Sequence, residues 1–214
     1  MIKILIADDH AIVRKGLKQI LAETHDMVVA GEAGNGPDLM DKVRAGDWDV
    51  VILDISMPGR GGLEILKQLK SERPGIHVLV LTMHPEDQYA IRVFKAGASG
   101  YLTKESAPEQ LVAAIRKVAR GGKYVSPHLA EKLAFDLEVG SEKPLHETLS
   151  DREYQVMRMI ASGKTVGNMA EELSLSVKTI STYRARILKK MKMNNNAELT
   201  HYVIRKKLIN NPQE

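Results

Sequence analysis

Side chains that can do chemistry stand in this sequence directly after short apolar runs. Three carboxylates follow such runs, Asp8 and Asp9 after one and Asp54 after another. The hydroxyl residue Thr82 ends a further run, and Lys104, which carries an ammonium group, follows the last one. Clustered carboxylates repel one another, so they are stable together with a cation among them, and ligands that are all oxygen suit Mg²⁺. A lysine ammonium can hold an anionic group as a point charge. Together these residue types predict a phosphoryl-transfer site in which one of the carboxylates is the nucleophile.

The apolar runs themselves predict the scaffold that would position these side chains. Expected strands cover residues 2–7, 27–30, 50–53, 77–82 and 101–103, and segments with apolar residues at helical spacing alternate with them. This alternation predicts an α/β fold with a five-stranded doubly wound parallel sheet, whose carboxyl ends meet at one edge. Met57-Pro58-Gly59 then takes the chain out of the sheet by a turn. Any one of the polar residues alone is equally well explained by turn capping or a surface ion pair, and the agreement of four strand ends favours a site.

Composition limits the class of protein. The 214 residues contain no cysteine, which excludes disulfides and thiolate metal sites, and no apolar run approaches the length of a bilayer span. No signal peptide is apparent, so we expect a soluble cytoplasmic protein with no membrane partner. From Leu149 onward there are 12 Lys and Arg against 6 Asp and Glu, whereas the residues before it carry 19 against 21. The basic excess of the rear part predicts contact with a polyanion there.

His10 follows the two acids and has two possible roles. It could be a metal ligand or proton shuttle, or it could be a helix-start or surface residue. The helix-start or surface role is favoured, because carboxylates already satisfy a hard cation and imidazole prefers softer ions.

The rear part predicts a small all-α helix-turn-helix domain. Ser150 and Glu153 have the spacing of a capping box, Ser174–Ser176 reads as a tight turn, and a long basic helix is expected over residues 177–191. The second helix of such a motif enters the major groove of DNA, where cations and hydroxyls suit phosphates and small polar residues can approach bases. Its exposed face would offer Lys178, Thr179, Ser181, Thr182, Arg184, Ala185, Arg186, Lys189 and Lys190. The alternative is a solvated basic helix on a small bundle.

The front part resembles the receiver domain of two-component response regulators, over residues 1–122. The resemblance rests on Asp8-Asp9, Asp54 followed by Met57-Pro58, Thr82 and Lys104. It implies that Asp54 accepts a phosphoryl group from a histidine kinase and that Mg²⁺ is bound by Asp8, Asp9, Asp54 and the backbone carbonyl of Ser56. It also implies that Lys104 pairs with the phosphoryl oxygens, that the Thr82 hydroxyl turns toward the phosphoryl group, and that Tyr101 changes rotamer as part of the switch.

Residues 148–214 resemble the LuxR-type output domain, and the whole chain is similar to the NarL/FixJ group of response regulators. This resemblance rests on Leu149–Glu153, Ala161-x-Gly163, Met169-Ala170, Ser176-x-x-Thr179-Ile180 and the helix through Met191. It implies a transcription factor that binds double-stranded DNA, with RNA polymerase as a further candidate partner. Asn196 departs from the pattern, since relatives often carry an Arg there. Either Asn195 or Asn196 can cap the last helix, expected over residues 197–208.

That last helix is implied to form the contact of a homodimer in the phosphorylated protein, through Leu199, Val203 and Ile204. The alternative is that this apolar stripe packs on its own domain.

Between the two domains, residues 123–147 are expected to be a linker with one helix. Ser126-Pro127 begins this helix, which ends near Leu137 and is followed by a flexible tether at residues 140–144.

Two other functions compete with this interpretation. Phosphatases that pass through an aspartyl-phosphate share the strand-end Asp, but they carry a second Asp two residues later, where this sequence has Ser56. The acid that would protonate a leaving group is therefore missing, and we expect no enzyme beyond self-limited phosphorylation and dephosphorylation. The other competitor is a receiver whose rear domain binds protein, against which the basic excess argues.

Overall fold

The structure is a computed structural model in which residues 1–59, 61–131 and 144–209 are described. The chain divides into two compact units, Met1–Leu133 and Ala134–Glu214. Within the described ranges no helix combines the length and the apolar character that crossing a membrane requires.

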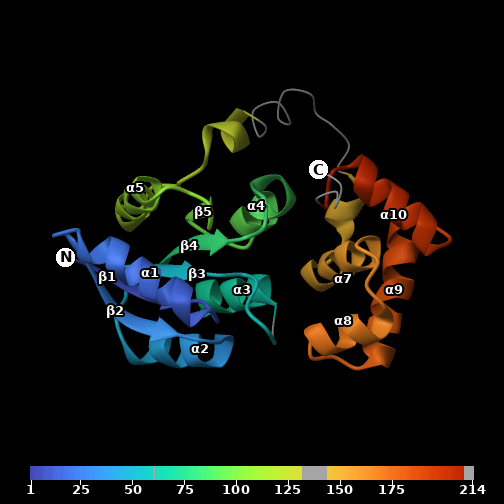
Figure 1. Cartoon of the computed structure of the whole chain (residues 1–214), viewed down its shortest axis with the longest axis horizontal. Coiled ribbons are helices and arrows are strands. Elements are labelled where there is room, and N and C mark those ends of the chain that lie inside the picture. The colour runs from blue at the N-terminus through green and yellow to red at the C-terminus, as the bar shows by residue number, and fades with distance from the viewer. Residues whose placement is uncertain (60, 132–143, 210–214) are drawn as a thin grey trace. The chain divides into compact units, whose positions relative to one another are not determined.

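A five-stranded parallel sheet forms the centre of the N-terminal unit (Figure 1). The strands lie in the order β2-β1-β3-β4-β5 and are all parallel. Their bounds are β1 Ile2–Ala7, β2 Met27–Ala33, β3 Val50–Leu53, β4 His77–Thr82 and β5 Gly100–Thr103. The predicted doubly wound sheet is confirmed. Strand β2 runs three residues further than predicted, and its pairing with β1 shifts register between Ile4 and Leu5.

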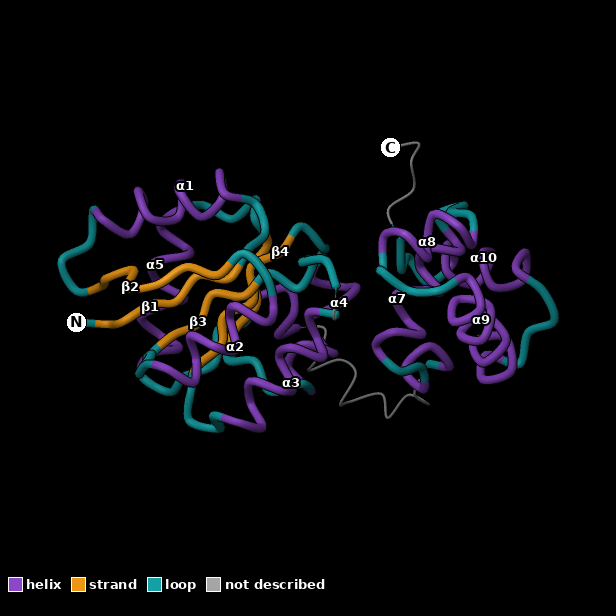
Figure 2. The backbone as a smooth tube through the Cα atoms, turned by 90° about the horizontal axis from the view of Figure 1, so that it is seen from below, coloured by secondary structure: helices purple, strands orange, loops and turns teal. Residues whose placement is uncertain are grey.

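Helices cover both faces of this sheet (Figure 2). Their bounds are α1 Ala11–Ala22, α2 Gly36–Ala45, α3 Gly62–Glu72, α4 Glu86–Lys95 and α5 Pro108–Ala119. Helices α1 and α5 bury leucines and an isoleucine against one face, where Ile4 and Ile52 of the sheet join them in a single apolar core. Burial of such side chains on both faces of a parallel sheet explains why its strands read as continuous apolar runs.

The chain that follows α5 returns to the edge of the sheet. Tyr124 forms an isolated parallel bridge with Gly100, and its amide donates to the carbonyl of Ser99 at 2.9 Å. Residues 127–131 are helical, as the Ser126-Pro127 pair predicts, and the Ser126 hydroxyl caps the turn by accepting from the amide of Leu129. The predicted helix end near Leu137 and most of the expected tether lie outside the described residues.

The C-terminal unit is helical. It consists of the 3₁₀ turn η1 Leu145–Thr148 and helices α7 Asp151–Ala161, α8 Val166–Glu172, α9 Val177–Met191 and α10 Asn196–Arg205. The predicted capping box is present, because Ser150 and Glu153 each bond the backbone amide of the other. The predicted turn between α8 and α9 is present as well, with Ser174 in the left-handed region at φ 53°. Asn195 caps α10, since its side chain accepts from the amide of Glu198.

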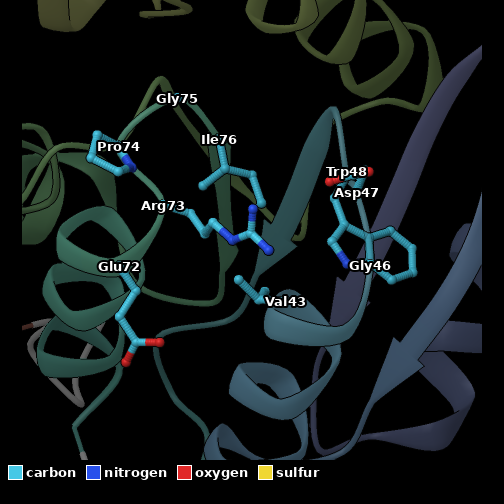
Figure 3. A pocket seen from close by; sticks show the side chains of 9 residues that line it. All are labelled: Val43, Gly46, Asp47, Trp48, Glu72, Arg73, Pro74, Gly75 and Ile76. Carbon is cyan, nitrogen blue, oxygen red and sulfur yellow. The ribbon is translucent and has the colours of Figure 1, made fainter.

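A hollow of about 280 Å³ lies where the chain enters β3 and β4, at the amino ends of the strands (Figure 3). Its lining residues are Val43, Gly46, Asp47, Trp48, Glu72, Arg73, Pro74, Gly75 and Ile76. None of the predicted site residues is among them, because those stand at the carboxyl ends.

Candidate functional site

The carboxyl ends of β1, β3 and β5 bring three of the predicted residues into direct contact. The ammonium nitrogen of Lys104 lies 2.6 Å from Oδ2 of Asp54 and 2.6 Å from Oδ2 of Asp8. Both carboxylates are almost fully buried. Burial alone would lower the pKa of Lys104, but its hydrogen bonds to Asp54 and Asp8 outweigh burial and raise the pKa above its ordinary value. Lys104 therefore remains a cation between the buried side chains of Asp54 and Asp8.

Asp54 is held from two further sides. Its amide donates to the carbonyl of Ala7 at 2.8 Å, which continues the pairing of β3 with β1, and its Oδ1 accepts from the amide of Ser56 at 2.8 Å. The carboxylate is thus fixed by the loop that follows β3, with Lys104 on its second oxygen. A carboxylate with a fixed orientation at a strand end is suited to act as a nucleophile.

Asp9 completes the acidic pocket. One ligand atom from each of Asp8, Asp9, His10 and Asp54 lies within 4.8 Å of all the others. Oδ1 of Asp9 is buried and accepts no hydrogen bond, although Nδ1 of His10 lies 3.0 Å from it. An unsatisfied buried carboxylate oxygen beside two more carboxylates fits a hard divalent cation. His10 precedes α1 with a side chain that is 61% exposed, which agrees with a helix-start and surface position.

Thr82 and Tyr101 lie on the neighbouring strands β4 and β5. Thr82 is fully buried, and its hydroxyl oxygen lies 3.1 Å from the hydroxyl oxygen of Ser56. The side chain of Tyr101 is also buried, and its hydroxyl donates to the carbonyl of His84 at 2.8 Å. Tyr101 is therefore anchored in the loop between β4 and α4, two residues beyond Thr82.

The second predicted surface lies on helix α9. Ile180, Ile187 and Met191 bury one side of this helix, so the opposite side faces solvent. Six of the predicted DNA contacts are exposed there: Lys178, Ser181, Thr182, Ala185, Arg186 and Lys189. Thr179 is only partly exposed, and its hydroxyl lies 2.8 Å from that of Ser176, which caps the helix.

Sequence reasoning missed two side-chain contacts made by α9. Lys190 is bound to Glu153 of the capping box at 2.6 Å, and Arg184 donates from Nε to the side chain of Asn196 at 2.7 Å. Both partners lie outside α9, on α7 and at the start of α10, so the periodicity of α9 does not reveal them. Asn196 thus has a hydrogen-bond role at the start of α10 although it departs from the family pattern.

The predicted dimer residues on α10 need correction. Leu199 and Val203 are fully buried within the C-terminal unit, where their side chains form part of its own core. A buried side chain has no surface to offer a second copy, so the self-packing alternative holds for these two residues. Ile204 is 47% exposed.

Comparison with known families identifies both units. Residues 4–116 match the response regulator receiver domain, and residues 147–203 match the LuxR family of bacterial regulatory proteins. This chain is a two-component response regulator. The response regulator is 39% identical over 211 residues to the response regulator UvrY of Escherichia coli K12, covering 98% of this chain and 97% of UvrY. It is also 39% identical over 210 residues to the response regulator GacA of Pseudomonas aeruginosa, covering 98% of each chain.

Solved structures support the same grouping. RcsB of Salmonella enterica serovar Typhimurium, solved bound to a promoter in the presence of the phosphomimetic BeF₃⁻, is 28% identical with a TM-score of 0.66. That comparison covers 95% of the response regulator and 98% of RcsB. The response regulator is therefore a transcription factor of the NarL/FixJ type that binds DNA through its LuxR-type helix-turn-helix domain. Its membership of the response regulator family argues against the phosphatase alternative.

Proposed function

We propose that the response regulator accepts a phosphoryl group from a histidine kinase on Asp54 and that this phosphorylation controls its binding to DNA. The contact of Lys104 with Asp54 and Asp8 carries the proposal, because a fixed carboxylate beside a cation is what in-line phosphoryl transfer requires. Membership of the two-component family supports the kinase as partner.

Mg²⁺ is the cation that the acidic pocket would hold. Its proposed ligands are Asp8, Asp9, Asp54 and the backbone carbonyl of Ser56. The buried oxygen of Asp9 that lacks a hydrogen bond supports this assignment. A bound divalent cation would neutralise charge that develops on the transferred group.

The remaining pocket residues respond to the new charge on Asp54. Lys104 pairs with the phosphoryl oxygens, as its present contact with Oδ2 of Asp54 supports. The hydroxyl of Thr82 turns from Ser56 toward the phosphoryl group, and Tyr101 responds through its anchor at His84. A group of charge near −2 is a sufficient cause for such a rearrangement.

The DNA contacts are proposed for the exposed side of α9. They are Lys178, Thr179, Ser181, Thr182, Ala185, Arg186 and Lys189.

The protein acts as a homodimer when phosphorylated, with Ile204 as the remaining candidate contact on α10. RcsB, which has been solved as dimers bound to DNA, supports this assembly. The proposed domains are the receiver at 1–122, a linker at 123–147 and the output domain at 148–214, in a cytoplasmic protein with RNA polymerase as a further partner.

A gel-shift titration tests the switch. The full chain is titrated onto a promoter fragment with and without acetyl phosphate and Mg²⁺, next to Asp54→Asn. We expect acetyl phosphate to tighten binding by the wild-type chain and to leave Asp54→Asn unchanged. Equal affinity of the wild-type chain in both conditions would contradict control by phosphorylation.

A further inference from the structure

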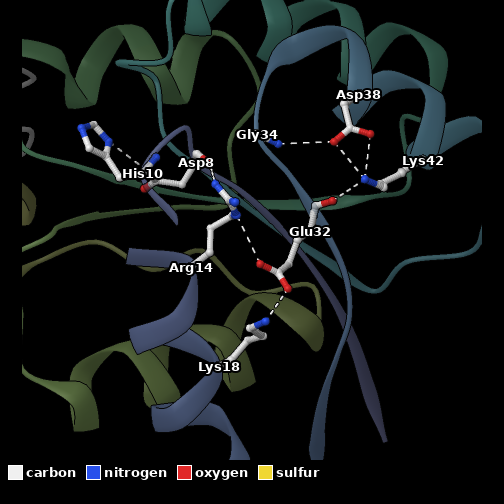
Figure 4. Close-up of polar contacts among 8 residues, drawn as sticks. All are labelled: Asp8, His10, Arg14, Lys18, Glu32, Gly34, Asp38 and Lys42. Carbon is white, nitrogen blue, oxygen red and sulfur yellow. Dashed lines mark hydrogen bonds and ion pairs between the residues drawn. The ribbon is translucent and has the colours of Figure 1, made fainter. Parts of the chain in front are cut away.

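A network of charged side chains reaches the acidic pocket from outside (Figure 4). Arg14 of α1 donates from Nη1 to the backbone carbonyl of Asp8 at 2.7 Å and from Nε to Oε2 of Glu32 at 3.2 Å. The other oxygen of Glu32 is bound by Lys18. These two hydrogen bonds, from Lys18 first and then Arg14, hold the pKa of Glu32 below its ordinary value. Glu32 is therefore an anion at neutral pH and a stable anchor for Arg14.

The atom that Arg14 binds gives this contact its importance. The carbonyl of Asp8 belongs to the peptide bond that joins Asp8 to Asp9, so Arg14 fixes the plane of the peptide between the two acids. The amide of Asp8 is held separately by the carbonyl of Ala33 at 3.1 Å. The backbone at the entrance to the pocket is thus bound on both sides of Asp8.

Asp9 depends on this backbone. Its buried Oδ1 accepts no hydrogen bond, and its close contact is with Nδ1 of the exposed His10 at 3.0 Å. The side chain of Arg14 is 19% exposed, which is less than half the 44% exposure of Lys18. Arg14 therefore differs from an ordinary surface ion pair, whose two partners are both well hydrated.

We propose that Arg14, anchored by Glu32, is a positioning residue that sets the Asp8–Asp9 peptide and thereby the geometry with which Asp9 meets a divalent cation. This inference rests on the proposed Mg²⁺ site. Arg14 acts through the backbone carbonyl of Asp8 and would touch neither the cation nor the phosphoryl group. The planar guanidinium reaches two acceptors in different directions, whereas the single nitrogen of a lysine in its place cannot span both.

The sign of the effect separates positioning from simple electrostatics. Removing a positive charge near three carboxylates would, by charge alone, tighten the binding of Mg²⁺. Loss of positioning weakens it instead, and outer residues that orient metal ligands typically change metal affinity by about 10-fold or more. We therefore expect Arg14→Gln and Arg14→Lys both to weaken Mg²⁺ binding by about 10-fold.

Isothermal titration of the full chain with MgCl₂ measures this affinity directly. Lys18→Gln is the matched control, because Lys18 binds the same carboxylate from the same helix but has no contact with Asp8. We expect its Mg²⁺ affinity to stay within about twofold of the wild-type value, since the loss of an exposed ion pair has little effect. Thermal unfolding without Mg²⁺ establishes that each variant is folded. If Arg14→Gln fails to fold, the Mg²⁺ affinity of Arg14→Lys tests the inference, because this variant keeps the charge and the aliphatic stem.

Two results would count against the inference, and they are distinct. If the wild-type chain binds Mg²⁺ and the Arg14 variants bind it equally well or more tightly, the positioning role alone is overturned. Absence of Mg²⁺ binding by the wild-type chain would overturn the proposed cation site and the inference with it.

Discussion

The ammonium of Lys190 lies 2.6 Å from Oε2 of Glu153, which joins the end of α9 to the capping box of α7. Glu153 is 3% exposed, and the same oxygen also accepts from the amide of Ser150 at 2.7 Å. Two adjacent lysines of α9 therefore have different tasks. Lys190 supports the fold of the C-terminal unit, whereas Lys189 is exposed and is one of the proposed DNA contacts.

Lys190→Gln is expected to lower the free energy of unfolding of the C-terminal unit by about 1–2 kcal/mol, because it leaves a buried carboxylate without its cation. Removing a partner from a fully buried pair costs more, but the side chain of Lys190 is 42% exposed and water compensates part of the loss. Urea unfolding of the full chain measures the change, with Lys189→Gln as the control. Equal destabilisation by the two variants would contradict the assignment.

Lys189→Gln is expected to weaken DNA binding and to reduce the slope of log affinity against log salt by about 1, since one phosphate contact is lost. Lys190→Gln should keep the wild-type slope. Fluorescence anisotropy on a promoter fragment at several salt concentrations gives both slopes. A reduced slope for Lys190→Gln with an unchanged slope for Lys189→Gln would reverse the roles of the two lysines.

The pair of Lys190 and Glu153 also predicts a pH dependence. Burial opposes ionisation of Glu153, but hydrogen bonds from Lys190 and Ser150 outweigh it and hold the pKa of Glu153 below its ordinary value. A carboxylate with a lowered folded pKa contributes stability that is present above about pH 4.3 and is lost as the pH falls through the folded pKa. Unfolding of Glu153→Gln in urea should therefore vary less than that of the wild-type chain across this acidic range, and parallel pH profiles would contradict the prediction.

Gly62 allows the loop after Asp54 to pack against α3. A Cβ at Gly62 would lie 2.3 Å from Cα of Ile55 and 2.5 Å from its carbonyl oxygen, and backbone atoms at this distance must move. Gly62→Ala should therefore cost about 2 kcal/mol or more and displace the loop that carries Ser56.

Gly16 provides the matched control for that substitution. It lies within α1, and a Cβ there meets nothing within 4 Å, so Gly16→Ala should stabilise the protein by up to about 1 kcal/mol through helix propensity. Thermal unfolding compares the two variants. Tolerance of Gly62→Ala would show that the loop adjusts more easily than its packing indicates.

Local pattern was enough to predict the scaffold. Strand β3 reads as an apolar run that ends in Asp54, and the Ser150–Glu153 box requires only a spacing of three residues, so both are visible in the sequence. The contact of Lys104 with Asp54 followed from parallel topology, which gathers strand ends at one edge.

Contacts that depend on side-chain direction could not be predicted. Arg14 and Glu32 meet only because α1 lies beside the end of β2, and no periodicity encodes that pairing. Leu199 and Val203 have the spacing of an apolar stripe, but spacing does not distinguish an internal core from a dimer surface. That distinction required the packing of α10 against α7 and α9.

The most direct test of phosphoryl acceptance locates the phosphoryl group itself. The full chain is incubated with acetyl phosphate and Mg²⁺, and the mass of the intact protein and of its peptides is measured, with Asp54→Asn and a sample containing EDTA alongside. We predict one phosphoryl group per chain, on the peptide that contains Asp54, and none in either control. A phosphoryl group on another residue, or one that persists in Asp54→Asn, would contradict the proposed site.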